Sequence, residues 1–286
     1  MTGIYTTSRY LLLIILLGLA GISCTQKDSN LVPTYIHVDS FAVTTSASLP
    51  ADVAYTHQIN SVWAYYNNNP IGVFDLPANI PVITNGNSTG VLTLRPGISV
   101  AGLNNFLATY PFYTSDTSTL VSQPGKTIQY LPKTTYYSST KFNFISKFEP
   151  STGTRFKLVD GTVPITINSD RNGLITLTAP TDTLSEDSSS VQFSIPLGKD
   201  AYIEFDYKCT VPFAVGLRAS LASIYTKYYL AGIYPSDHWQ KFYLSVKDFE
   251  AQYQATTYNM YIKTVLPTGE TSGTVLIDNI QLVYFD

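Results

Sequence analysis

Aromatic side chains that could bind a sugar are concentrated in one short segment, SIYTKYYLAGIYPSDHW, residues 223–239. Sugars bind aromatic faces because their axial C–H groups stack on the ring while their hydroxyls reach nearby polar groups. Tyrosine is also common in strands, where alternate positions are buried, so we expect two or three of these aromatic residues to lie in the core. The candidate ligand-binding residues are Tyr225, Tyr228, Tyr229, Tyr234 and Trp239.

Acidic residues in the second half of the chain are scattered and form no spaced pair. A glycosidase needs two positioned carboxylates, and no two of these can be placed together from the sequence, so we predict a protein without catalytic activity. The acidic stretch SEDSSS, Ser185 to Ser190, is expected to be a solvated loop. The residues concerned are Glu149, Asp170, Asp182, Glu186, Asp187, Asp206, Asp248 and Glu250.

Histidine and cysteine are too sparse for zinc or thiol chemistry. His37, His57 and His238 are far apart and belong to no spaced ligand motif. The two cysteines are Cys24 and Cys209. Cys209 ends an alternating run, AYIEFDYKCT, so we expect this thiol to be buried and inert.

Composition and patterning indicate an all-β protein. The net charge is −3 and only 13% of residues are charged, so the chain lacks the basic footprint of a nucleic-acid-binding protein. After residue 24 no segment has a sustained apolar stripe at helical spacing. Short alternating runs recur instead, separated by Gly, Pro, Asn and Asp, which is typical of β-sandwiches.

The amino terminus has the pattern of an export signal. Leu11–Ala20 is an apolar run of ten residues after Arg9, half the length of about 20 that a membrane-spanning helix needs. The run ends in GISC, which resembles the lipobox of bacterial lipoproteins, although Gly21 stands where that family favours leucine. The resemblance implies cleavage before Cys24, lipidation of Cys24 and an outer-membrane location. An ordinary secreted protein is the alternative.

The pattern divides the chain into a signal peptide (1–23), a polar tether (24–32) and two β domains (33–145 and 147–286). In the first domain, INSVWAYYNNNPIGVFDLP reads as a hairpin, because Asn tolerates left-handed backbone angles and Pro70 starts the exit. The succession of IGVFDLP and NGNSTGVLTLRPGI resembles the small Ig-like modules related to PEGA domains, which implies an Ig-like β-sandwich.

The second domain opens with FEP at 148–150 and closes with VLIDNIQLVYF at 275–285. These two motifs resemble the opening and closing strands of the galactose-binding-like jelly rolls found among carbohydrate-binding modules. The whole chain is similar to two-domain surface lipoproteins of the Bacteroidetes type. The resemblance implies a jelly-roll β-sandwich without catalytic activity that binds glycans.

The same resemblance implies a structural calcium ion that ties the opening strand to the closing one. Glu149 and Asp278 match those two motifs, and the loop NSDRNG offers Asn168 and Asp170 as further oxygen ligands. The alternative is that Asp278 hydrogen-bonds a neighbouring loop without a metal.

Two functions therefore stay open at this point. The first is a lipid-anchored protein that binds a polysaccharide through the jelly roll. The second is a structural or assembly lipoprotein that docks on an outer-membrane protein complex. An exposed aromatic row on the jelly roll favours the first, and a broad apolar patch across both domains favours the second.

Overall fold

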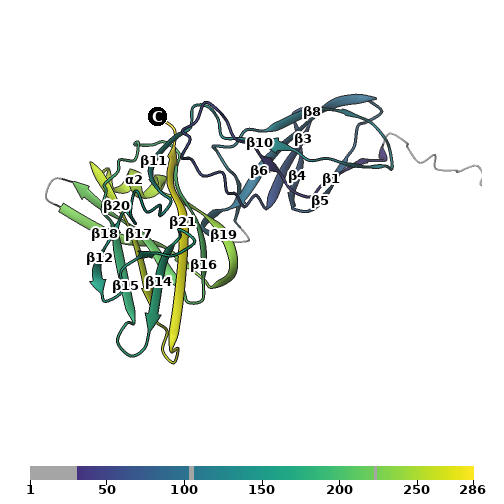
Figure 1. Cartoon of the computed structure of the whole chain (residues 1–286). Coiled ribbons are helices and arrows are strands. Elements are labelled where there is room, and N and C mark those ends of the chain that lie inside the picture. The colour runs from purple at the N-terminus through teal and green to yellow at the C-terminus, as the bar shows by residue number, and fades with distance from the viewer. Residues whose placement is uncertain (1–30, 103–105, 222–223) are drawn as a thin grey trace, which may run out of the picture.

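The structure, a computed structural model, describes residues 31–102, 106–221 and 224–286. These residues form an all-β protein of two β-sandwiches that lie side by side (Figure 1), as the sequence pattern predicted. The expected signal peptide, Cys24 and nearly all of the tether lie outside the described residues. Within the described part of the chain, no helix is both long and apolar enough to cross a membrane.

The N-terminal sandwich packs two sheets around one apolar core. Alternation places Ile36 and Val38 of one sheet against Val62, Ala64 and Leu94 of the other. The first sheet has the order β5 (Ala78–Val82), β1 (Thr34–Val38) and β9 (Thr127–Gln129). The second has the order β4 (Asn69–Asp75), β3 (Ser61–Tyr66), β6 (Thr89–Ser99) and β7 (Leu107–Thr109), with β8 (Asp116–Val121) also on β6. Smaller elements are the 3₁₀ turn η2 (Val100–Gly102) and the parallel pair β2 (Ala42–Val43) and β10 (Lys133–Thr134).

The predicted hairpin is β3 and β4, joined by a two-residue turn. Asn67 and Asn68 have φ angles of 49° and 64°, the left-handed region that a tight hairpin turn requires at both central positions. The pattern predicted a turn over residues 67–70, but the turn is limited to Asn67 and Asn68, and Asn69 and Pro70 already belong to β4.

The C-terminal sandwich packs a six-stranded sheet on a five-stranded sheet. The six-stranded sheet has the order β13 (Thr166–Ile167), β14 (Gly173–Thr178), β21 (Ser272–Tyr284), β16 (Ala201–Cys209) and β19 (Ser236–Ser245), with β11 (Lys141–Ser146) also on β21. The five-stranded sheet has the order β12 (Phe156–Gly161), β15 (Leu184–Ser189), β20 (Thr257–Val265), β17 (Phe213–Leu221) and β18 (Ile224–Ile233).

The core between these two sheets contains the inward residues of every long strand, among them Ile203, Phe205, Leu217 and Ile277. Cys209 is part of it and is 2% exposed, which confirms the predicted burial, and burial raises the pKa of its thiol. The short helix α2 (Lys247–Tyr253) follows β19.

Strand β11 shows where the chain enters the second sandwich. Residues 141–145 were expected in the first domain, yet β11 pairs with the end of β21 and belongs to the six-stranded sheet. The physical reason is the length of β21. Strand β14 covers one edge of β21 only from Ser272 to Ile277, and β11 covers the same edge from Ile280 to Tyr284.

A third apolar cluster joins the two sandwiches. It combines residues of the N-terminal half with Tyr243 of β19 and Val283 of β21. In Figure 1 the N-terminal sandwich lies on the side of β16, β19 and β21, away from β12 and β18. The N-terminal members are Leu49, Val53, Ile98, Tyr110, Phe112, Tyr113 and Tyr136.

Candidate functional site

All five aromatic residues singled out from the sequence are exposed. The prediction that two or three would be core residues is wrong, because the segment lies on edge strands and at the turn between them. Tyr225, Tyr228 and Tyr229 belong to β18, an edge of the five-stranded sheet, and Trp239 belongs to β19, an edge of the other sheet. Their exposed fractions are 62% for Tyr225, 46% for Tyr228, 38% for Tyr229, 83% for Tyr234 and 43% for Trp239.

The five do not form one row. Tyr228 contacts the α2 residues Phe249 and Tyr253, with ring centroids 6.2 and 5.2 Å away. Tyr234 lies in the turn between β18 and β19, and Trp239 lines a cleft on the other sheet. Tyr225 and Tyr229 remain as a pair on one strand face.

Tyr225 and Tyr229 lie on the outer face of the five-stranded sheet, the face turned away from the core. Across the strands Tyr225 pairs with Ser220, Lys227 with Arg218, and Tyr229 with Gly216. On the far side of β17, Arg218 pairs with Asn259 and Gly216 with Tyr261. Directly paired residues point to the same face of a sheet. We call this surface the open face: Lys157, Asp160, Glu186, Ser188, Gly216, Arg218, Ser220, Tyr225, Lys227, Tyr229, Asn259, Tyr261 and Lys263.

Gly216 sets the spacing of the aromatic rings on the open face. A β-bulge in β18 brings its backbone close to β17 here, and a Cβ at Gly216 would lie 2.2 Å from the carbonyl oxygen of Tyr228. Only glycine permits this approach. It also leaves the position between Tyr229 and Tyr261 without a side chain.

Arg218 is held in place by neutral neighbours. Its Nη2 donates to Oδ1 of Asn259 at 2.8 Å, and Nδ2 of Asn259 donates to the carbonyl oxygen of Ser189 at 2.9 Å. The guanidinium carbon lies 5.1 Å from the ring centroid of Tyr225 and 5.9 Å from that of Tyr261, within cation–π range. The buried Nε has no hydrogen-bond partner among the described residues.

Glu186 supplies the buried carboxylate of the open face. The SEDSSS stretch was expected to be a solvated loop, but Leu184–Ser189 is the buried strand β15 and Glu186 is 2% exposed. Lys227 and Lys263 both donate to Glu186, the latter at 3.0 Å. Burial alone would raise the pKa of Glu186, but the hydrogen bonds from the two lysines outweigh it and lower that pKa. The ionised carboxylate therefore fixes both lysines beside Tyr229, whose ring centroid lies 5.6 and 6.0 Å from their ammonium nitrogens.

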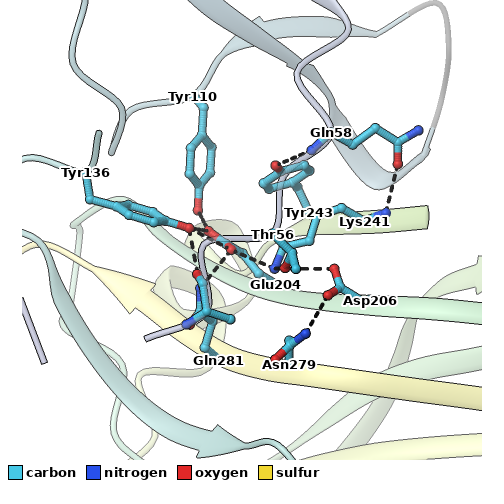
Figure 2. A network of polar contacts seen from close by, with 11 residues as sticks. Thr56, Gln58, Tyr110, Tyr136, Glu204, Asp206, Lys241, Tyr243, Asn279 and Gln281 are labelled. Carbon is cyan, nitrogen blue, oxygen red and sulfur yellow. Dashed lines mark hydrogen bonds and ion pairs between the residues drawn. The ribbon is translucent and has the colours of Figure 1, made fainter. Parts of the chain in front are cut away.

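The outer face of the six-stranded sheet is covered by the N-terminal sandwich. Glu204 on β16 is fully buried at the centre of this contact (Figure 2). It accepts hydrogen bonds from the hydroxyls of Tyr110 and Tyr136 and from Nε2 of Gln281. Nζ of Lys241 lies 3.2 Å from Glu204 Oε2. Burial, followed by the charge of Glu204, raises the pKa of both tyrosines well above the usual value, so their hydroxyls stay protonated donors.

Backbone groups of residues 54–58 complete this contact. The amide of Ala54 donates to Oε1 of Gln281 at 3.1 Å, and Nε2 of Gln281 donates back to the Ala54 carbonyl at 3.2 Å. The amide of Gln58 donates to the Tyr243 hydroxyl at 3.1 Å. We call this surface the covered face: Tyr202, Glu204, Asp206, Lys241, Tyr243, Gln281 and Val283.

A cleft of about 640 Å³ lies where the covered face emerges from under residues 56–57. Asp278 lines it, and the buried Oδ1 of that carboxylate has no hydrogen-bond partner within residues 31–102, 106–221 and 224–286. Burial raises the pKa of Asp278 to about 6, and the charges of Asp206 and Glu149 add to the effect. The lining residues are Thr56, His57, Asp170, Asn172, Asp206, Trp239, Gln240, Lys241, Asp278 and Asn279.

The structure brings two of the four predicted calcium ligands to this cleft, Asp170 and Asp278. The carboxylate of Glu149 instead accepts a hydrogen bond from Arg171 at 3.1 Å. Oδ1 of Asn168 caps its own loop by accepting the amides of Asp170 and Asn172 at 3.0 and 2.8 Å. Among the described residues, no three acidic, histidine or cysteine side chains are grouped as a metal ion would require. These four residues do not fit the ion as they stand, and calcium stays a prediction.

Sequence reasoning missed the polar half of the open face. These residues come from three different strands, and no local pattern relates the strands: Glu186 from β15, Arg218 from β17, and Asn259 and Lys263 from β20. The only local signal was the alternation of β18, which placed Tyr225, Lys227 and Tyr229 on one side of a strand.

No family model and no curated protein matches this sequence. Solved structures that match about half of this chain include mutants of a family 29 carbohydrate-binding module. One mutant is 13% identical to this protein. The match covers 50% of this chain and 85% of the chain of the mutant, with a TM-score of 0.36. A mutant complexed with cellulohexaose is 15% identical and covers 51% and 92%, with a TM-score of 0.35. A mutant complexed with mannohexaose is 12% identical and covers 50% and 92%, with a TM-score of 0.36.

Proposed function

We propose that this protein binds a glycan, without turning it over, through the open face of its C-terminal sandwich. One observation carries the proposal. Two exposed tyrosines, Tyr225 and Tyr229, lie on one strand face beside polar groups that are already held in place, namely Arg218, Lys227 and Glu186. A sugar needs this combination, because ring faces bind its C–H groups and fixed donors and acceptors bind its hydroxyls.

The fixed polar groups matter as much as the rings. A lysine or arginine that is already ordered loses little further side-chain entropy when a ligand arrives. Individual stacking contacts are weak, so we expect modest affinity for one copy of the chain. Many copies on one surface would raise the effective concentration and retain a polymer firmly.

The test is a glycan array with the full chain and two matched tyrosine variants. Tyr229→Ala should weaken binding by about 1–3 kcal/mol, the scale of one aromatic contact in an interface. Tyr234→Ala is the control, because Tyr234 is more exposed but lies in the turn, off the open face. If Tyr229→Ala binds like the unaltered protein and Trp239→Ala does not, the cleft is the glycan site and the open face is not.

We also propose that the chain is held on the outer membrane by lipid on Cys24. The support is the GISC sequence after a ten-residue apolar run. Each buried methylene contributes about 0.8 kcal/mol, and more than one acyl chain is needed for stable anchoring. Cys24→Ser should move the protein from the membrane to the soluble fraction. A variant that still sediments with membranes and needs detergent for release would contradict the anchor.

The assembly function predicts a different result. A protein that docks on an outer-membrane complex should co-purify with that complex and be retained by no glycan. If this result is obtained with protein whose circular-dichroism spectrum shows that it is folded, the assembly function replaces the glycan proposal.

A further inference from the structure

The open face carries more positive than negative charge in a chain whose net charge is −3. The strand register places four basic side chains on it and two carboxylates, a surplus of two positive charges. The basic residues are Lys157, Arg218, Lys227 and Lys263, and the acidic ones are Asp160 and Glu186. The net charge of the open face is opposite in sign to that of the whole chain, so composition alone does not explain it.

Arg218 accounts for one of these two surplus positive charges. Lys227 and Lys263 both bind Glu186, whereas none of the ion pairs in the described part of the chain includes Arg218. Its hydrogen bond to Asn259 uses a neutral amide. A guanidinium has five N–H donors, so this bond leaves most of the donors and the whole charge uncompensated.

Lys241 on the covered face is a buried cation that offers a comparison with Arg218. Lys241 lies 3.2 Å from a carboxylate oxygen of Glu204 and 3.6 Å from one of Asp206. Its side chain is 2% exposed, and its charge is balanced on both sides. Arg218 is partly exposed and has no such partner.

Arg218 is also oriented for a planar anion. The guanidinium lies over the Tyr225 ring at 5.1 Å and near the Tyr261 ring at 5.9 Å, which restricts its plane. A restricted guanidinium binds a carboxylate with two parallel hydrogen bonds, a geometry that neutral hydroxyls do not match.

We infer that the open face binds an acidic glycan, and that Arg218 binds a carboxylate of its uronic acid residues. The inference rests on the proposed glycan binding and adds the class of glycan. The sugar ring contacts Tyr229 and the free side of Tyr225, and the carboxylate lies against the guanidinium of Arg218.

The experiment compares acidic polymers with neutral polymers of the same backbone. Polygalacturonate, alginate and hyaluronate are each offered to the full chain by affinity electrophoresis, beside a carboxyl-reduced form of the same polymer. At least one acidic polymer should bind at least ten-fold more tightly than its reduced form. Its affinity should fall as the salt concentration is raised, because salt screens charged contacts.

Arg218→Gln should remove this preference, so that the acidic and the reduced polymer bind alike. Arg171→Gln is the matched control. It makes the same charge change at an exposed arginine that contacts Glu149, away from the open face, and the preference should be retained. A thermal melt shows whether each variant is folded. If Arg218→Gln is not folded, the salt dependence of polymer binding by the unaltered protein tests whether the preference for the acidic polymer depends on charge.

The outcomes separate this inference from the proposed function. Binding of reduced or other neutral polymers as tight as that of the acidic ones overturns the acidic specificity and leaves glycan binding standing. A preference for acid that survives Arg218→Gln in a folded variant overturns the assignment to Arg218. Retention of no polymer, acidic or neutral, overturns glycan binding itself.

Discussion

The two outer faces of the C-terminal sandwich use the same residue types for opposite purposes. On the covered face, the tyrosine hydroxyls of Tyr110 and Tyr136 are bound to Glu204, and Lys241 is 2% exposed between two carboxylates. On the open face the tyrosines are exposed, and Lys227 is 38% exposed. Tyrosine, lysine and glutamate join two domains where their hydroxyl, ammonium and carboxylate groups bind one another, as those of Tyr136, Lys241 and Glu204 do. They form a binding surface where some of these groups stay exposed.

The largest effect should come from the centre of the covered face. Glu204→Ala leaves Lys241 buried with Asp206 as its one remaining carboxylate partner among the described residues. Removal of one partner of a buried ion pair costs about 3–5 kcal/mol. Urea unfolding at constant pH measures the loss. Glu149→Ala is the control, because its ion pair with Arg171 is exposed on both sides and such pairs contribute about 0–1 kcal/mol. Equal losses in the two variants would show that the covered face is no more tightly coupled than the surface.

The next effect concerns the spacing of the open face. Gly216→Ala places a methyl group against the Tyr228 carbonyl and should cost about 1–3 kcal/mol through overpacking, with weaker glycan binding because Tyr229 moves. Gly232→Ala, on the neighbouring strand, is the control: a Cβ there meets no atom within 4 Å. Chemical denaturation and the glycan array are run on both. A stable Gly216→Ala variant with normal affinity would rule out the proposed role of the bulge.

A smaller effect depends on pH and tests the cleft beside the covered face. The pKa of Asp278 is about 6, above the ordinary value of 3.8 for an aspartate, so the folded state binds this proton more tightly than the unfolded state. The resulting stability is fully present below about pH 4 and is lost as pH rises through about 6. The change should be about 1–2 kcal/mol, since one pKa unit corresponds to about 1.4 kcal/mol and the group is partly solvated. Unfolding free energies at several pH values should show this loss in the unaltered protein and not in Asp278→Asn.

The same Asp278→Asn variant also tests calcium binding. If the ion binds at Asp278, millimolar calcium should raise the melting temperature of the unaltered protein and leave Asp278→Asn unchanged. A melting temperature that does not respond to calcium or to a chelator would contradict the calcium prediction.

The smallest effect should come from the carboxylate of the open face. Glu186→Gln frees Lys227 and Lys263, which are 38% and 31% exposed and can be solvated by water. We expect a stability loss of about 1 kcal/mol or less. Affinity for an acidic glycan should rise by roughly two- to fivefold, because the positive surplus grows. Weaker binding of the acidic glycan by a folded variant would mean that Glu186 itself contacts the sugar.

Local pattern was enough for the elements and their class. Alternation in YIHV and SVWAYY placed Ile36, Val38, Val62 and Ala64 in one core, because a strand turns every second side chain to the same face. Asn67 and Asn68 marked a turn through their tolerance of positive φ. The burial of Cys209 followed from the same periodicity.

Local pattern failed where a polar residue is buried by distant partners. SEDSSS looks solvated, yet Glu186 is buried because Lys227 and Lys263, 41 and 77 residues away, reach it. The aromatic segment looked like a single cluster. Within this segment the chain instead passes from one sheet to the other, and its aromatic rings lie in four places: the open face, the contact with α2, the turn and the cleft.

What the sequence by itself determined is therefore the all-β class, the strands and the inner face of each strand, all of which depend on neighbours a few residues apart. Only the tertiary structure decided which outer face is covered and which is open. That choice depends on contacts such as Ala54 with Gln281, 227 residues apart, and on the pairing of Arg218 with Lys227 and Asn259 across three strands. Hydrophobic periodicity specifies the inner side of each sheet, but an outer side is defined by which other part of the chain packs on it.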